Sequence, residues 1–245
     1  MKAFDILEAV WEAFWWWSVA LLSFVGGLAD SLWRKFVERL TPPQHHFGVR
    51  VVLISDTHGC HWQLKIPDGD VLIHGGDFTR MGREEDAVDF NNWLGELPHA
   101  HKIVVDGNHE HNAPWKARTA AMLSNATFLR DTAVTLPNGL RVHGTGFCWP
   151  MKSRNPTYEA VADGSADVLV CHGPVAGYAD GGSGCAELLR LVRRLKPRLV
   201  VSGHIHASHA VVDGRGGESG TTFVNAANAH RGHAHMGWEP VVVDL

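Results

Sequence analysis

Five short polar clusters in this sequence are rich in residue types that bind metal ions. Each cluster follows an apolar run, and together they supply three oxygen donors and four imidazoles. The side chains are those of Asp56, His58, Asp77, Asn108, His172, His204 and His206. A site that mixes carboxylate, amide and imidazole ligands favours Mn²⁺, Fe or Zn²⁺ over Ca²⁺, which prefers oxygen ligands alone.

The number of candidate ligands indicates two metal ions. Seven side chains are too many for one catalytic ion that keeps an open position. Two ions that share a bridging carboxylate would use them all. Such a pair clamps phosphoryl oxygens and lowers the pKa of a bound water, so that hydroxide forms near neutral pH.

The spacing within two clusters is also informative. Asp56 and His58 are separated by one residue, and so are His204 and His206. On an extended backbone, residues two apart point to the same side. We therefore expect each pair to reach one ion, or two adjacent ions, from one extended segment.

The apolar runs predict the elements that position these clusters. Runs of Val, Ile and Leu at 51–55, 70–75, 102–106, 167–171 and 198–202 are typical of buried strands. Residues just past the C-terminal ends of such strands line the ligand crevice of open α/β sheets. Apolar spacing predicts helices over 84–97 and 185–195, the second with an N-cap near Ser183. Further β-like runs lie at 140–144, 208–213, 221–226 and 240–245. Together they predict a two-sheet core flanked by helices.

Composition narrows the class of protein. The chain has 245 residues and a net charge of −4, so no basic footprint for nucleic acid is present. Its four cysteines form no C-x-x-C pair, which favours reduced thiols and a cytosolic type of compartment. A pair of ions that clamps phosphoryl oxygens would act on small phosphoesters, and the sequence leaves the oligomeric state open.

The N-terminal segment differs from the rest. Residues 13–29 carry no charge, tryptophans crowd one end, and the paired prolines of 41–47 indicate a linker. We expect a hydrophobic, aromatic helix and linker over 1–47 and a catalytic domain over 48–245. Residues 13–29 fit either a membrane span or an amphipathic helix lying on the membrane or on the domain. Basic residues after this stretch place the catalytic domain on the cytoplasmic side.

The ordered set DTH, GD, GNHE, HGP and GHIH resembles the calcineurin-like metallophosphoesterase superfamily. Stretches such as LISDTHG, KIVVDGNHE and KPRLVVSGHIH are most similar to the metallophosphoesterase-domain-containing protein group. The resemblance covers residues 50 to 245. It implies an α/β fold of the metallophosphoesterase type: a four-layer sandwich of two mixed β-sheets flanked by helices, with the metal ligands on strand-end loops.

The resemblance also implies a division of the ligands. The first set would be Asp56, His58, Asp77 and His206, and the second set Asp77, Asn108, His172 and His204, so that Asp77 bridges two divalent or trivalent ions. His109 would donate to a phosphoryl oxygen or protonate the leaving group, the alternative being an outer hydrogen-bonding role. Some members of the closer group lack the histidine that corresponds to His206 and have weakened activity.

The expected activity is hydrolysis of phosphodiesters, cyclic nucleotides among them, by a hydroxide between the ions. The alternatives are a phosphomonoesterase and a membrane-tethered metal-binding scaffold of low activity. The C-terminal run of His230, His233 and His235 fits either a solvated turn or a metal-binding surface loop.

Overall fold

The computed structural model describes residues 47–149, 154–214, 220–230 and 232–245. Phe47–Leu245 forms one compact unit. The predicted N-terminal helix and linker lie outside the described residues, except for Phe47, and stay predictions. Within the described part of the chain, no helix is long and apolar enough to cross a membrane.

Two mixed sheets form the centre of this unit. The first has the order β11-β1-β2-β3-β4, and the second β5-β6-β7-β8-β10-β9. In the first sheet, β1 to β4 run parallel and β11 pairs antiparallel with β1. In the second, β6, β7, β8 and β10 run parallel, while β5 and β9 are antiparallel edges. The strands are β1 Arg50–Ile54, β2 Val71–His74, β3 His101–Val105, β4 Thr127–Leu129, β5 Thr132–Thr135, β6 Arg141–Gly144, β7 Val168–Val170, β8 Leu199–Ser202, β9 Ala210–Asp213, β10 Thr222–Asn225 and β11 Val241–Asp244.

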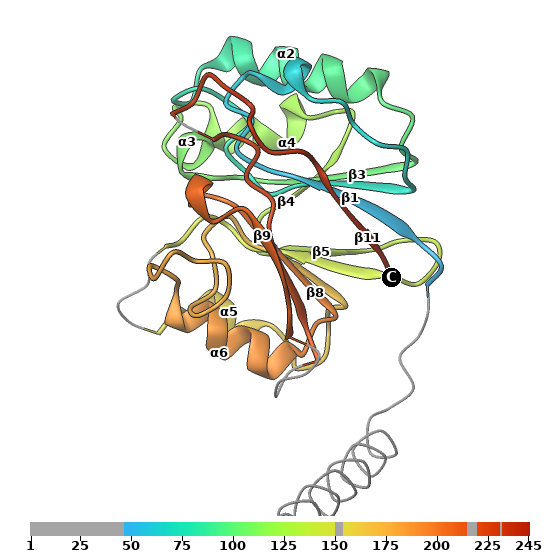
Figure 1. The fold of residues 1–245 in the computed structure, drawn as a ribbon, viewed down its shortest axis with the longest axis vertical. Coiled ribbons are helices and arrows are strands. Elements are labelled where there is room, and N and C mark those ends of the chain that lie inside the picture. The colour runs from blue at the N-terminus through green and yellow to red at the C-terminus, as the bar shows by residue number, and fades with distance from the viewer. Residues whose placement is uncertain (1–46, 150–153, 215–219, 231) are drawn as a thin grey trace, which may run out of the picture. The chain divides into compact units, whose positions relative to one another are not determined.

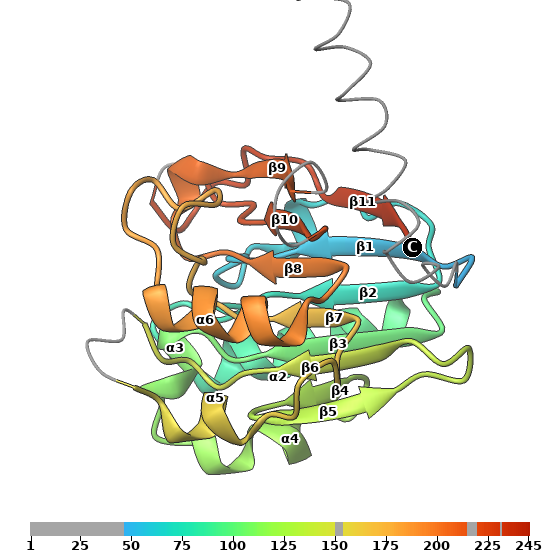
Figure 2. The ribbon, with the colours of Figure 1, turned by 90° about the horizontal axis from the view of Figure 1, so that it is seen from below.

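Helices cover the outer face of each sheet, which gives four layers (Figures 1 and 2). Figure 1 shows α2 and α4 above the first sheet, and α5 and α6 below the second. The α-helices are α2 Glu84–Glu96, α3 Asn108–His111, α4 Thr119–Met122, α5 Pro156–Ala160 and α6 Ala186–Leu195, and the 3₁₀-helices are η1 His61–Gln63, η2 Lys116–Arg118 and η3 His206–Ser208. The α/β sandwich of two mixed sheets flanked by helices is therefore confirmed.

Successive side chains of a strand point to opposite faces of its sheet, which explains the apolar layers on both sides of the sheet. In β1, Val51 and Leu53 belong to the core between the sheets, while Val52 and Ile54 pack with the helices outside. All four are fully buried, because a strand covered on both faces is apolar throughout. On α2, Phe90 and Leu94 turn the same face toward the first sheet.

The second long helix begins later than its sequence suggests. The N-cap of α6 is Cys185 rather than a residue near Ser183, and its side chain makes no capping hydrogen bond. Asp180 instead accepts hydrogen bonds from the backbone of Gly177, Gly182 and Gly184, so its carboxylate orders the preceding loop. The helix ends with Lys196 in a left-handed conformation before Pro197, which cannot continue it.

Candidate metal centre

The parallel strands bring the candidate ligands to one edge of the sandwich. Asp56 and His58 follow β1, Asp77 follows β2, and Asn108 begins α3 after β3. His172 follows β7, and His204 and His206 follow β8. Each sheet therefore supplies part of the site, and the site forms where the two sheets pack together.

Two clusters of side chains result. The ligand atoms of Asp56, His58 and His206 lie within 4.8 Å of one another, and so do those of Asp77, His172 and His204. The first cluster contains three members of the first implied set, and the second cluster contains three members of the second implied set. Asn108 lies beside His109, whose backbone N–H donates to Asp77 Oδ1 at 2.9 Å.

The backbone of these clusters is not extended, so the expectation from spacing is wrong in its geometry. Asp56, His58, Asp77 and His204 all have a positive φ, between 45° and 66°. His206 belongs to η3. Left-handed residues other than glycine are uncommon and carry strain, which recurs at functional sites. The chain therefore turns sharply after each strand, and these turns direct the side chains to a common point.

Two glycines allow the turns to approach each other. A Cβ on Gly107 would clash with Asp77 Oδ1, and a Cβ on Gly203 would clash with Asp56 Oδ2. Any side chain at either position would displace a candidate ligand carboxylate. Glycine is therefore required here by close approach rather than by its backbone angles.

Distances between donor atoms test whether a metal ion fits. His58 Nε2 lies 3.2 Å from His206 Nε2, which is 3.2 Å from Asp56 Oδ1. His172 Nε2 lies 3.3 Å from Asp77 Oδ2. Ligand atoms each 2.0–2.1 Å from one tetrahedral ion are separated by roughly 3.3 Å. The donors are thus spaced as ligands of common ions would be.

Unsatisfied polar atoms support the same fit. Among the described residues, Asn108 Oδ1 and His172 Nε2 are buried without a hydrogen-bond partner. Buried polar groups are rarely left unpaired, because desolvation without a partner costs about 1–3 kcal/mol for each group. The residues present therefore fit a pair of metal ions.

The protonated imidazole of His172 balances part of the negative charge of Asp56 and Asp77. Although burial lowers it, the carboxylates of Asp77 and Asp56 raise the pKa of His172 to about 10. Burial lowers the pKa of His58 to about 4 and that of His204 to about 4, so both are neutral near pH 7. His172 donates from Nδ1 to the Gly75 carbonyl at 2.8 Å, which turns Nε2 toward Asp77. A metal ion would replace the positive charge of the His172 proton.

Glu110 holds the first-sheet loops together. It is fully buried and accepts hydrogen bonds from the backbone N–H groups of Asp77, Thr79 and Gly107, and from the Thr79 hydroxyl. Burial and the nearby Asp77 charge raise the pKa of Glu110 to about 8, and the four donors oppose that rise. Its sequence position beside His109 permitted an orienting role but could not reveal these partners.

His74 is a structural residue. It is fully buried, accepts from the Gly76 N–H at Nδ1 and contacts the Thr57 hydroxyl through Nε2. Both ring nitrogens therefore have partners, and burial lowers the pKa of His74 to about 3.

His109 faces the candidate metal ligands from α3. Its Nε2 lies 3.7 Å from Asp77 Oδ2, and Nδ1 lies 2.9 Å from both the Thr79 carbonyl and the Met81 N–H. The neutral tautomer that accepts from Met81 carries its proton on Nε2, toward the site. The geometry therefore lets His109 present a proton to a bound substrate.

Comparisons with known proteins agree with this geometry. The calcineurin-like phosphoesterase model matches residues 49–208. Metallophosphoesterase domain-containing protein 1 of Homo sapiens is 33% identical over 237 residues, covering 80% of this chain and 71% of that protein. UPF0046 protein K07C11.7 of Caenorhabditis elegans is 35% identical over 214 residues, covering 76% and 71%.

A solved structure shares the fold. The protein TT1561 of Thermus thermophilus has a TM-score of 0.52 and 13% identity, covering 75% of this chain and 91% of that chain. Its low identity makes this a likeness of fold alone. By the family match and its relatives, the chain belongs to the calcineurin-like phosphoesterases, a family of metal-dependent phosphoester hydrolases.

Proposed function

We propose that this protein hydrolyses phosphodiesters, nucleotides among them, with two metal ions held at the edge of the sandwich. The observation that carries the proposal is the pair of donor clusters, spaced as metal ligands are and adjacent to the imidazole of His109. Asp56, His58 and His206 would hold one ion, Asn108, His172 and His204 the other, and Asp77 would bridge them.

The ions, when bound, would supply Lewis acidity toward the phosphoryl oxygens and a water of lowered pKa. In the reaction, a water oxygen would form the new bond to phosphorus and lose its proton to solvent while the bond to the leaving oxygen breaks. His109 in its imidazolium form would give the proton on Nε2 to the leaving oxygen and be left as the neutral imidazole. In that form Nδ1–H donates to the Thr79 carbonyl, which orients the ring for this transfer.

Aromatic surface beside the second set supports a nucleotide substrate. The Trp149 ring centroid lies 4.4 Å from that of His204, and the Phe147 centroid lies 5.6 Å from that of His172. A base that stacks on an aromatic side chain gains about 1–3 kcal/mol without sequence preference. These rings therefore suit a flat leaving group or nucleoside.

The test compares a diester with a monoester. The Mn²⁺-loaded full chain should hydrolyse bis-p-nitrophenyl phosphate faster than p-nitrophenyl phosphate, and should also act on 2′,3′- or 3′,5′-cyclic nucleotides. Asp77→Ala should reduce the diester rate by more than about 100-fold, since even residues that only support metal ligands cost 10–100-fold. Equal rates for the two proteins would refute the mechanism.

Two other results would favour the alternatives. A preference for the monoester would indicate a phosphomonoesterase. Two ions per chain by elemental analysis, without turnover of any ester, would indicate a metal-binding scaffold.

We further propose that residues 13–29 attach the protein to a membrane. The uncharged stretch and its cluster of tryptophans support this. The full chain should sediment with vesicles, and replacing Trp15, Trp16 and Trp17 by Gln should weaken that sedimentation. An intact chain that stays in solution without detergent contradicts the proposal.

A further inference from the structure

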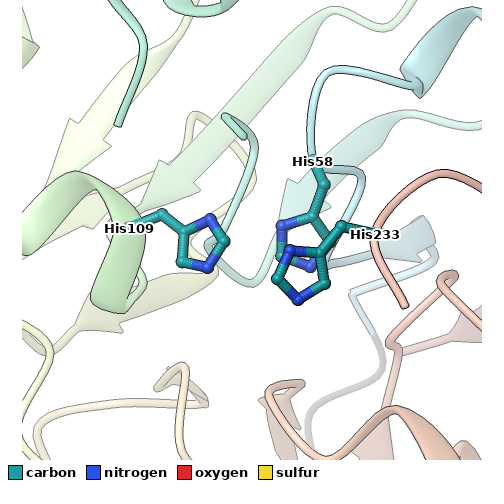
Figure 3. Close-up of side chains that lie close together, drawn as sticks. All are labelled: His58, His109 and His233. Carbon is teal, nitrogen blue, oxygen red and sulfur yellow. The ribbon is translucent and has the colours of Figure 1, made fainter. Parts of the chain in front are cut away.

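The imidazole of His233 also lies beside the candidate metal centre. The ring of His233 stacks on that of His58, with centroids 4.2 Å apart and an angle of 14° between the planes. It also lies 5.1 Å from the ring of His109 and 5.8 Å from that of His206. Figure 3 shows the rings of His58, His109 and His233 gathered from three segments: the loop after β1, α3 and the C-terminal loop.

The loop that carries His233 is fixed to the site. Asn228 is fully buried; its Oδ1 accepts from the Ser55 N–H, and its N–H donates to the Ser55 carbonyl. The Asn228 carbonyl accepts from the N–H groups of Gly237 and Trp238, which closes the loop at its base. Asn228 thus links both ends of the loop to the end of β1, just before Asp56.

Contacts with η1 hold the middle of the same loop. The Gln63 side chain donates to the Ala234 carbonyl at 3.4 Å and accepts from the Met236 N–H at 3.3 Å. The Cys60 thiol donates to the carbonyl of His233 itself at 3.7 Å. These contacts hold His233 and the residues that follow it, so its place beside His58 follows from the fold.

The stacked geometry argues against a third metal ion. The lone pairs of an imidazole lie in the plane of the ring, so two nearly parallel rings do not direct them to a common point. His58 also already contributes Nε2 to the first set, 3.2 Å from His206 Nε2. His233 is therefore poorly placed to share an ion with His58.

The same geometry suits hydrogen bonding to a ligand. His233 is partly exposed, and among the described residues neither of its ring nitrogens has a hydrogen-bond partner. An imidazole always carries at least one N–H, and its donation to an anionic oxygen is a strong hydrogen bond. Together with His109, it borders the first set, whereas Phe147 and Trp149 contact imidazoles of the second set.

We propose that His233 is a substrate-binding residue, whose ring N–H donates to a non-bridging oxygen of the phosphoester alongside His109. This inference rests on the proposed phosphoesterase function and adds a contact that does not depend on metal ligation. The ligand class is any phosphoryl or phosphate-like anion held at the metal pair.

The test uses the full chain loaded with Mn²⁺ and measures anion binding as well as turnover. His233→Ala should weaken the binding of inorganic phosphate and of orthovanadate, measured by calorimetry, by about 10-fold or more. The KM for bis-p-nitrophenyl phosphate should rise by a similar factor, with a smaller change in kcat. Of His233→Asn and His233→Gln, which each keep an N–H donor, at least one should recover much of the affinity.

His235→Ala is the matched control, because His235 lies two residues away on the same loop and is exposed. It should bind phosphate as the unchanged protein does. All variants should retain the same number of ions per chain and the same unfolding midpoint.

Two results would overturn the inference. One is unchanged phosphate affinity and KM in His233→Ala. The other is the loss of one ion per chain in that variant, which would make His233 a metal ligand. If the unchanged protein binds phosphate through His233 but hydrolyses no phosphodiester, the proposed function fails while this contact stands.

Discussion

The loops that follow the first sheet are joined by the buried carboxylate of Glu110, whereas those that follow the second sheet are joined by the buried amide of Asn225 and are also tied to the first sheet. Glu110 joins the turns that carry Asp77 and Asn108. His204 and His206, by contrast, are tied to Asp56: the His204 N–H lies 3.0–3.1 Å from both carboxylate oxygens, and His206 Nε2 lies 3.2 Å from one.

Exposure does not follow the same division. Asp56, His58 and Asp77 are buried to within 2% of complete burial, but so is His172 of the second sheet. Asn108 of the first sheet is partly exposed, as are His204 and His206 of the second. The two halves differ in charge instead: the first sheet supplies both carboxylates of the site, and the second sheet supplies imidazoles alone.

Loss of the Asp56 carboxylate, which contacts His204 and His206 of the second sheet, should have the largest effect on activity and metal content. Asp56→Asn keeps the size of the side chain but removes the charge that attracts His206 and the ion of the first set. We expect more than about 100-fold loss of phosphodiester hydrolysis and fewer than two ions per chain by elemental analysis. Asp68→Asn, at an exposed position, is the control. Full activity with two ions would mean that the halves assemble without Asp56.

Glu110→Gln tests the rigidity of the first half. The amide would turn an N–H₂ group toward donors that the carboxylate now accepts, and the turns around Asp77 would relax. Affinity for Mn²⁺, measured by chelator competition, should fall by about 10–100-fold. Glu85→Gln, at a side chain that is 80% exposed, should leave the affinity unchanged. Equal affinities in the two variants would show that Glu110 does not orient the site.

The attraction between protonated His172 and the carboxylates of Asp77 and Asp56 should make the stability of the metal-free protein depend on pH. The pKa of His172 is raised to about 10 in the metal-free protein, so its protonated form stabilises the fold fully below its unfolded pKa of about 6.5. This contribution is lost as pH rises toward 10. The unfolding midpoint of chelator-treated protein should therefore fall between about pH 6.5 and 9.

His172→Asn is the control for this pH range. Its unfolding midpoint should fall less steeply with rising pH than that of the unchanged protein. His58 and His204, whose pKa values are lowered to about 4, act in the opposite direction, since stability rises as pH rises from about 4 through 6.5; their effect lies mostly below this pH range. Mn²⁺ should flatten the profile because the ions replace the proton. A metal-free midpoint that is independent of pH would contradict the assignment.

The smallest effect is expected at the edge of the first sheet. Arg50 and Asp244 form an exposed ion pair at 3.0 Å between β1 and β11. Exposed pairs contribute little, so Arg50→Ala should leave the unfolding midpoint and the activity within experimental error. A clear loss of either would mean that the strand pairing depends on this contact rather than on the backbone ladder and the core.

Much of this fold could be predicted because a strand buried on both faces needs a short run of apolar residues, which is easy to recognise in the sequence. The runs at 51–55 and 198–202 contain β1 and β8, and the runs late in the chain contain β6, β9, β10 and β11. The short strands β4 and β5 were missed. Three or four residues such as Thr132–Thr135, half exposed at a sheet edge, carry too little apolar periodicity to be recognised.

The candidate site was predictable in composition but not in conformation. Residue types and order indicated which side chains would meet, whereas the left-handed turns at Asp56 and His204 depend on tertiary contacts that spacing does not encode. The position of His233 depends on the contacts of Asn228 with Ser55 and of Gln63 with Ala234, whose members lie 173 and 171 positions apart in the sequence.

The pairing of β1 with β11 also has a consequence for synthesis. Arg50 and Asp244 are separated by 194 positions, so the strand that carries the first ligands leaves the ribosome long before its outer neighbour. Until then one edge of β1 is open to pairing with another chain. Asn228 likewise reaches Ser55 only after the 173 positions between them have been made. Metal loading of the finished site should therefore wait for residues 228 to 244, and a nascent chain stalled before Asn228 should hold neither ion tightly.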